Sequence, residues 1–165
     1  MMMSKTTVMA IIVGLVVLFG GSVWLASTMA NSAQVEMSEG AVAVVEEKSY
    51  DWGEIKIDGG IVEKVFLVKN EGDEVLKLFN VETSCVCTTA QMAKGEQTSP
   101  VFGMHDKSQY VLEVDPGETV DVLVKFDPMF HGPNGVGPIS RTVTIETNDV
   151  SSPKLSWMLT AMVVR

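Results

Sequence analysis

The sequence predicts an all-β protein, a single β-sandwich preceded by one N-terminal transmembrane helix, and three observations carry this prediction. Apolar and polar residues alternate in several short runs, which is the period of half-buried strands. Residues typical of tight turns separate these runs. Before the first run, residues 8–26 carry no charge, and this length is close to the roughly 20 residues that cross a bilayer as a helix.

The uncharged stretch is predicted to be a membrane anchor. Lys5 is the only charged residue before Glu36, and it favours an N-terminus in the cytoplasm. The stretch lacks the polar face of a globular helix and is longer than the apolar core of a cleaved signal peptide. Residues 1–30 are therefore predicted to be an anchor, with a signal sequence cleaved near Ala30 as the alternative. Either way, the rest is exported, which predicts a single-pass protein of the cell membrane with its C-terminal domain outside the cytoplasm, periplasmic or extracellular.

The exported part is acidic. All 21 acidic residues follow Ala30, against 11 of the 12 basic ones, so this part has a net charge of about −10. Such a charge argues against nucleic acid and anionic lipid as partners. The expected partners are the membrane, through residues 8–26, and an unidentified protein. Residues 31–41 are small and polar and are predicted to be a linker, and residues 42–165 suffice for one domain with one core.

The strand pattern is clearest in residues 120–126, where every second residue is apolar. No run after Ala30 has a convincing helical period. Similar alternation surrounds Phe66, Leu76, Val143 and Trp157. Turn residues occupy positions 58–60, 70–73, 115–118 and 148–149. Many short strands separated by tight turns favour a sandwich.

Both cysteines lie in residues 83–88, with the sequence Thr-Ser-Cys-Val-Cys-Thr. In an extended backbone, Cys85 and Cys87 share one face with Cα atoms about 6.6 Å apart, so both sulfurs could bind one ion. A disulfide between them would need a Cα separation near the upper limit, unless the backbone turns there. Because exported compartments oxidise thiols, the pair is expected to be bonded or liganded rather than free.

Histidine and methionine residues add to a possible soft-metal site. Thiolate, thioether and imidazole together suit Cu(I) and, after it, Zn(II). If loops at one end of the sandwich converge, the candidate ligands are Cys85, Cys87, Met104, His105, Met129 and His131. The simpler interpretation is that both histidines are exposed loop residues without a ligand. The expectation is therefore no cofactor, with copper as the alternative and thiol exchange at the cysteines as a further one.

A series of short motifs resembles one known family. The motifs are residues 50–55, 66–73, 76–81, 83–88, 116–118, 122–127 and 143–149. Their order resembles the domain of unknown function 1573 family, a bacterial Ig-like, Hydin-type β-sandwich. The chain departs from the family in having Val86 where Gly is usual, which favours an extended backbone, and in residues 90–109, which look like an insertion. The resemblance implies a fold and an exported location and leaves the activity open.

Enzyme signatures are absent from the sequence. There is no recognisable nucleophile motif, phosphate-binding loop or His-Glu-x-x-His zinc motif, and Cys-x-Cys differs from the Cys-x-x-Cys of thioredoxin-like sites. We therefore expect no catalytic activity. The predicted function is a membrane-anchored extracytoplasmic Ig-like domain that acts as a protein-binding or assembly module. The alternative is a copper-binding or thiol-redox protein that uses Cys85 and Cys87.

Overall fold

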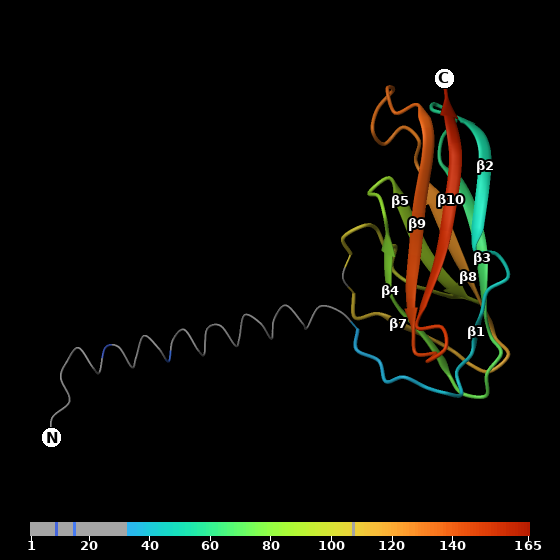
Figure 1. Ribbon diagram of the computed structural model, residues 1–165, viewed down its shortest axis with the longest axis vertical. Coiled ribbons are helices and arrows are strands. Elements are labelled where there is room, and N and C mark those ends of the chain that lie inside the picture. Colours follow the sequence, from blue (N-terminus) through green and yellow to red (C-terminus); the bar gives the residue numbers. More distant parts are fainter. Residues whose placement is uncertain (1–8, 10–14, 16–32, 107) are drawn as a thin grey trace. The chain divides into compact units, whose positions relative to one another are not determined.

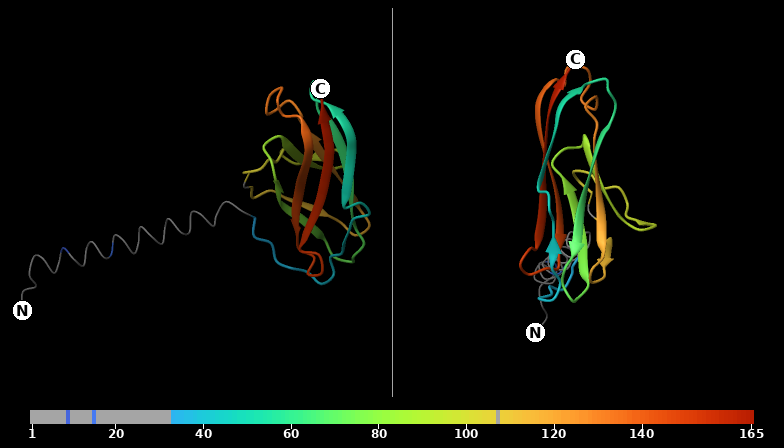
Figure 2. Two further views of the ribbon diagram at one scale, coloured as in Figure 1. Left: turned by 45° about the horizontal axis from the view of Figure 1, so that its top comes forward. Right: turned by 90° about the vertical axis from the view of Figure 1, so that its right-hand side faces the viewer.

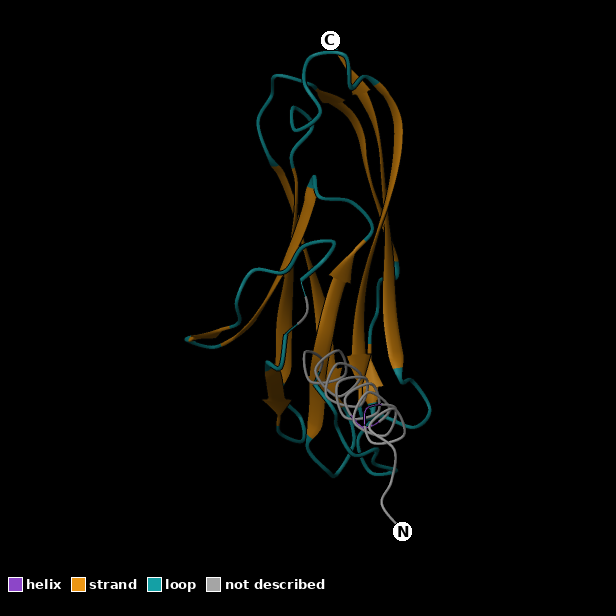
Figure 3. Cartoon of the chain, turned by 90° about the vertical axis from the view of Figure 1, so that its left-hand side faces the viewer, coloured by secondary structure: helices purple, strands orange, loops and turns teal. Residues whose placement is uncertain are grey.

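The computed structural model describes residues 9, 15, 33–106 and 108–165. Residues 33–165 of this set form a compact unit made of strands and loops (Figure 3). The strands are β1 (Ala43–Val44), β2 (Ser49–Lys56), β3 (Val62–Asn70), β4 (Leu76–Thr83), β5 (Thr88–Lys94), β6 (Gln97–Thr98), β7 (Val111–Val114), β8 (Thr119–Phe126), β9 (Gly137–Thr147) and β10 (Lys154–Val164).

The strands form two sheets that pack face to face (Figure 1 and Figure 2, right). One sheet has the order β1-β3-β8-β5-β6 and the other β2-β10-β9-β4-β7. Paired strands run antiparallel, except that β2 pairs with β10 in parallel. The all-β sandwich expected from the alternating pattern is therefore confirmed.

The core consists of the apolar residues that the alternation placed on one face of each strand. Val120, Val122 and Val124 of β8 are fully buried, while Asp121 between them is exposed. Across the core, the ring of Phe66 on β3 lies 5.7 Å from that of Trp157 on β10, so these large side chains join the two sheets. Burial of such side chains contributes about 1.5–3 kcal/mol each.

The segment predicted to be a linker packs against the sandwich. The amide of Ala33 donates to Ser108 O at 3.2 Å, the amide of Ser38 donates to Asn148 O at 2.7 Å, and Ala41 is fully buried. The compact unit thus begins at Ala33 rather than at residue 42. The small, polar composition does not reveal this packing, because backbone hydrogen bonds and the burial of two small residues, Ala33 and Ala41, hold the segment in place.

The apparent insertion at residues 90–109 begins inside the sheet. Strand β5 pairs with β8, with Thr88 opposite Phe126, and its residues Ala90 and Met92 are buried. The amides of Ala90 and Phe102 each donate to the other residue's carbonyl, which ties the following loop to β5. Ala90, Met92 and Phe102 of this segment therefore belong to the core.

The predicted membrane span lies outside the described residues. Among those that are described, no helix is long and apolar enough to cross a bilayer.

Candidate functional site

The two cysteines lie in the turn that carries the chain from one sheet to the other. Thr83 ends β4 and Thr88 begins β5 in the opposite sheet. The amide of Thr88 donates to Cys85 O at 3.0 Å, which closes a β-turn over residues 85–88. The Thr83 hydroxyl lies 3.0 Å from Cys85 O and 2.9 Å from Thr88 O, so it holds both ends of this turn.

The backbone therefore turns at the cysteines, and the extended geometry that Val86 favours does not form. The Cα atoms of Cys85 and Cys87 are 5.2 Å apart instead of the 6.6 Å of a strand. Val86 does not prevent the turn, because a type I turn needs no positive φ. Among the described non-glycine residues only Asn80 has a positive φ, of 47°. The chain must cross between the sheets here, and the Thr83 hydroxyl stabilises the turn. Together these outweigh the preference of the β-branched Val86 for an extended backbone.

The cysteines form a disulfide whose two sulfurs have unequal surroundings. Cys87 is only 4% exposed and packs in a small apolar cluster with Ile57, Phe126 and Val163. Cys85 lies at the rim of this cluster and is half-buried. The amide of Cys87 donates to Cys85 Sγ at 3.3 Å. An incoming reagent therefore has easier access to Cys85 than to Cys87.

Arg141 on β9 is the nearest cation to the buried sulfur. Its Nε donates to Cys87 Sγ at 3.2 Å, its Nη1 donates to Ser140 O at 2.8 Å, and its Cζ lies 5.7 Å from the centre of the Phe126 ring. Within the described part of the chain, no carboxylate forms an ion pair with this guanidinium. Its positive charge is therefore placed to stabilise a thiolate at Cys87.

His131 approaches the other sulfur from the β8–β9 loop, at the end of the sandwich where β10 ends (Figure 1). Its Nε2 lies 3.6 Å from Cys85 Sγ. The amide of Asp127 donates to Cys87 O at 3.0 Å, which fixes the start of the loop beside the cysteines. Gly132, with φ of +80°, then donates to Met129 O at 2.8 Å and reverses the chain next to His131.

The structure thus brings three of the six predicted ligands together. The donor atoms of Cys85, Cys87 and His131 all lie within 4.8 Å of one another. In the described residues, His105 is not part of this group. Met129 lies in the same loop as His131, and Met104 follows Gly103, whose carbonyl accepts the Thr83 amide at 3.4 Å. Both methionines are 39% exposed.

Sequence reasoning missed Arg141. Its neighbours Ser140 and Thr142 gave no local signal, since Ser-Arg-Thr is an ordinary strand sequence. Its position follows from register: the Thr142 amide donates to the Ser84 hydroxyl at 2.8 Å, and the Ser84 amide donates to Thr142 O at 2.9 Å. These bonds bring β9 alongside the cysteine turn.

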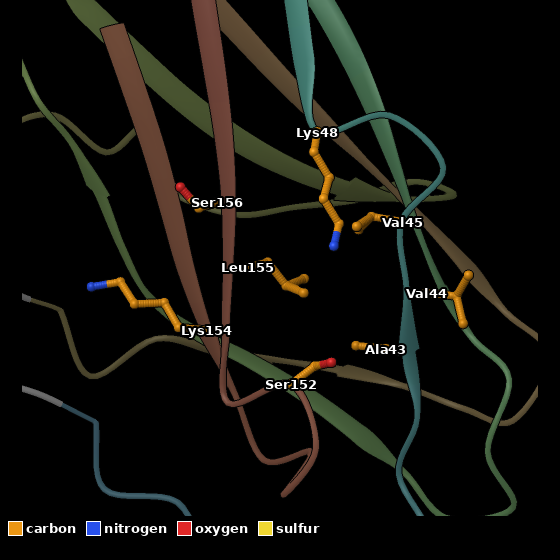
Figure 4. Close-up of a pocket in the computed structure, with 8 residues that line it drawn as sticks. All are labelled: Ala43, Val44, Val45, Lys48, Ser152, Lys154, Leu155 and Ser156. Carbon is orange, nitrogen blue, oxygen red and sulfur yellow. The ribbon is translucent and has the colours of Figure 1, made fainter.

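A separate hollow of about 340 Å³ lies between the β1 region and β10 (Figure 4). Lys48 extends into it towards Leu155, whereas the amino group of Lys154 points away from it. Binding sites usually have several polar groups that converge on one point. This hollow does not, so the cysteine turn is the stronger candidate site.

Comparisons with known proteins agree with this fold. Residues 43–100, which include both cysteines, match the family described as protein of unknown function (DUF1573), and this match supports the resemblance found in the sequence. No curated protein matches the chain. A protein of unknown function from Porphyromonas gingivalis W83 has a similar structure, with a TM-score of 0.58 and 20% identity, over 76% of this chain and 49% of that one. The chain therefore spans about half the length of that relative.

Two other solved structures also match part of this chain. A family 123 glycoside hydrolase from Clostridium perfringens matches with a TM-score of 0.51 and 7% identity, over 76% of this chain and 27% of that one. A PapD-like domain of human CEP192 matches with a TM-score of 0.49 and 16% identity, over 79% of this chain and 91% of that one. At these identities the likeness concerns the fold alone.

Proposed function

We propose that this chain, a match to the DUF1573 family over residues 43–100, is a membrane-anchored extracytoplasmic Ig-like domain that binds protein partners by thiol–disulfide exchange. The observation that carries the proposal is the inequality of the two sulfurs. Cys85 Sγ lies at the rim, and Cys87 Sγ is buried beside the Arg141 guanidinium. Exchange depends on which sulfur is accessible and on how well the leaving thiolate is stabilised.

The exchange step assigns a role to each sulfur. A thiolate of the partner protein attacks Cys85 Sγ and forms a new S–S bond. The Cys85–Cys87 bond breaks, and its electron pair leaves on Cys87, where Arg141 Nε already donates a hydrogen bond at 3.2 Å. The reverse attack of Cys87 on Cys85 releases the partner, so the bond to the partner is reversible.

A partner with two thiols allows a net redox reaction. Its second thiolate attacks the mixed disulfide, and the partner leaves with a disulfide of its own. Two electrons and two protons then remain on Cys85 and Cys87 as thiols. The partner class is therefore an exported protein with one or two accessible cysteines, which combines the binding-module and thiol-redox predictions. The uncharged residues 8–26 support placement of the domain at an oxidising side of the membrane.

A matched pair of variants tests the proposal on the full chain in detergent. Cys87→Ser leaves the accessible thiol, and Cys85→Ser leaves the buried one. We expect Cys87→Ser to form a mixed disulfide with glutathione disulfide at least about tenfold faster, since access governs the rate of exchange. Equal rates for the two variants would contradict the proposal. Thermal melts of both variants check that each is folded.

The wild type gives a second readout. Reaction with reduced glutathione, followed by alkylation and peptide mapping, should find glutathione on Cys85 and the alkyl group on Cys87. Arg141→Gln should slow this reaction by about tenfold or more, because a hydrogen bond to a charged group contributes about 1.5–3 kcal/mol. Attachment of glutathione to Cys87 would reverse the assigned roles and defeat the proposal.

A further inference from the structure

We infer that the dithiol form of this site binds Cu(I) through Cys85 Sγ, Cys87 Sγ and His131 Nε2. This inference goes beyond thiol exchange, because it needs only reduced cysteines and no partner protein. The three donor atoms come from two segments distant in sequence, the cysteine turn and the β8–β9 loop. They nevertheless lie within 4.8 Å of one another.

The distances suit a three-coordinate ion. With metal–ligand bonds of about 2.0–2.3 Å, neighbouring ligand atoms are separated by roughly 3.4–4 Å. His131 Nε2 already lies 3.6 Å from Cys85 Sγ. Once the disulfide is reduced, the two sulfurs are free to separate to a similar distance. The third edge of the triangle joins His131 Nε2 to Cys87 Sγ. The Asp127 amide holds Cys87 beside the start of the loop that carries His131.

The donor types favour Cu(I) over Zn(II). Soft thiolate ligands select Cu(I), and imidazole suits it as well. Structural zinc sites are tetrahedral with four protein ligands, whereas the cysteines, histidines and carboxylates among the described residues supply only three in this group.

Arg141 completes the charge balance of the site. Two thiolates and one Cu(I) carry a net charge of −1, and the Arg141 guanidinium with Nε 3.2 Å from Cys87 Sγ offsets it. In the described structure no carboxylate pairs with this guanidinium, so its charge is available to the metal complex.

Binding is controlled by oxidation state. The disulfide has no thiolate to offer, so it must first take up two electrons and two protons from a reductant, for example a dithiol that is itself converted to a disulfide. Each resulting thiol then loses its proton on binding Cu(I). An external disulfide that accepts two electrons from the two thiolates and two protons, and is itself reduced to two thiols, re-forms the Cys85–Cys87 bond and so releases the ion.

The test uses the purified full chain and Cu(I) itself. The protein is reduced with a phosphine, desalted without oxygen and titrated with Cu(I) in competition with bathocuproine disulfonate. We expect one Cu(I) per reduced chain, with a rise in Tm by mass action, and no binding to the disulfide form. Equal binding to both forms, or Zn(II) binding in the absence of Cu(I) binding, would overturn the inference.

Histidine and methionine variants identify the ligands. His131→Ala should weaken Cu(I) binding by at least about tenfold, because loss of even an outer-shell partner typically costs 10–100-fold in affinity. His105→Ala is the matched control, because it removes an exposed loop histidine outside the group, and it should bind like wild type. Met104→Leu and Met129→Leu should also bind like wild type. Wild-type affinity in His131→Ala, or a loss in any of the other three, contradicts the assigned ligand set.

Two readouts on the wild type separate this inference from thiol exchange. Copper titration uses the reduced chain, whereas mapping of glutathione onto Cys85 uses the disulfide form. If glutathione attaches to Cys85 as expected but the reduced wild type binds no Cu(I), the copper site alone is overturned. Normal copper binding with equal reactivity of the two cysteines would overturn the exchange proposal alone.

Discussion

Asp149 shows how one residue joins segments far apart in sequence. The side chain is 1% exposed and accepts hydrogen bonds from the Ala43 amide at 2.9 Å and from the Ser151 amide and hydroxyl at 2.7 and 2.6 Å. Burial by itself would raise the pKa of Asp149, but the hydrogen bonds from Ser151 and Ala43 hold this pKa below its ordinary value of 3.8. The ionised carboxylate therefore stabilises the folded state.

Asp149→Asn should lose this contribution at neutral pH. The amide nitrogen of Asn cannot accept the hydrogen bonds of a carboxylate, and we expect a cost of about 1.5–3 kcal/mol. Because the folded pKa is the lower one, the contribution is complete above the ordinary pKa of the unfolded chain and is lost as the pH falls through the folded pKa. Thermal melts from pH 7 to pH 2 should show that the difference in stability between variant and wild type disappears in acid.

The control for this experiment is Asp121→Asn, which changes an exposed carboxylate on β8. It should alter the free energy of unfolding by no more than about 0.5 kcal/mol at pH 7. A gap between Asp149→Asn and wild type that stayed constant down to pH 2 would show that ionisation of Asp149 does not matter.

At the scale of the element, strand β8 connects the core to the candidate site. Its valines fill the interior, and its last residue, Phe126, packs with Cys87 in the small apolar cluster. The Phe126 ring also stacks on Trp52 at 6.0 Å and lies 5.7 Å from Arg141 Cζ. Packing at the end of β8 therefore supports both the disulfide and the cation beside it.

We expect Phe126→Ala to destabilise the fold far more than Asp121→Ala. Truncation of a buried Phe typically costs about 3–5 kcal/mol, whereas an exposed change usually stays within about 0.5 kcal/mol. Urea unfolding of both variants measures the difference. If the two midpoints moved equally, the assignment of the faces of β8 would be wrong.

Elements with large apolar side chains were predictable, and β8 and β10 are the clearest cases. Strand β5 lies partly in the segment taken for an insertion, because residues 90–109 lengthen the path that the resembling family usually takes from the cysteines to the turn at 116–118. Local sequence also identified Cys85 and Cys87 and proposed His131. It could not place Arg141, since that depends on how β9 and β4 align, nor the turn at the cysteines, which depends on the Thr83 hydroxyl and the crossing between sheets.

At the scale of the whole molecule, the packed segment before β1 sets the boundary of the folding unit. Gly40 O accepts the amides of Asp73 and Glu74 at 2.9 and 3.1 Å, and Ala41 is fully buried. These contacts join the segment to the β3–β4 turn. Residues 33–41 therefore belong to the fold, although their composition is that of a linker.

Two truncated proteins test this boundary. Residues 33–165 expressed alone should give a cooperative melt, and residues 42–165 should be less stable by about 2 kcal/mol or more. The reason is that several backbone hydrogen bonds, each worth about 0.5–1.5 kcal/mol, are lost together. Identical melting curves for the two proteins would show that residues 33–41 are a linker that does not stabilise the fold.

The parallel pairing of β2 with β10 has a consequence for the timing of assembly. Ser49 pairs with Met158 and Lys56 with Val164, so this pairing spans almost the entire domain. Contacts between such distant residues form slowly. In the sheet order, β2 has β10 as its one neighbour among the described strands, so the edge of β2 stays unpaired until β10 has formed. Completion of the sandwich therefore waits for the last strand, and in that interval the free edge of β2 is a template for pairing with another chain.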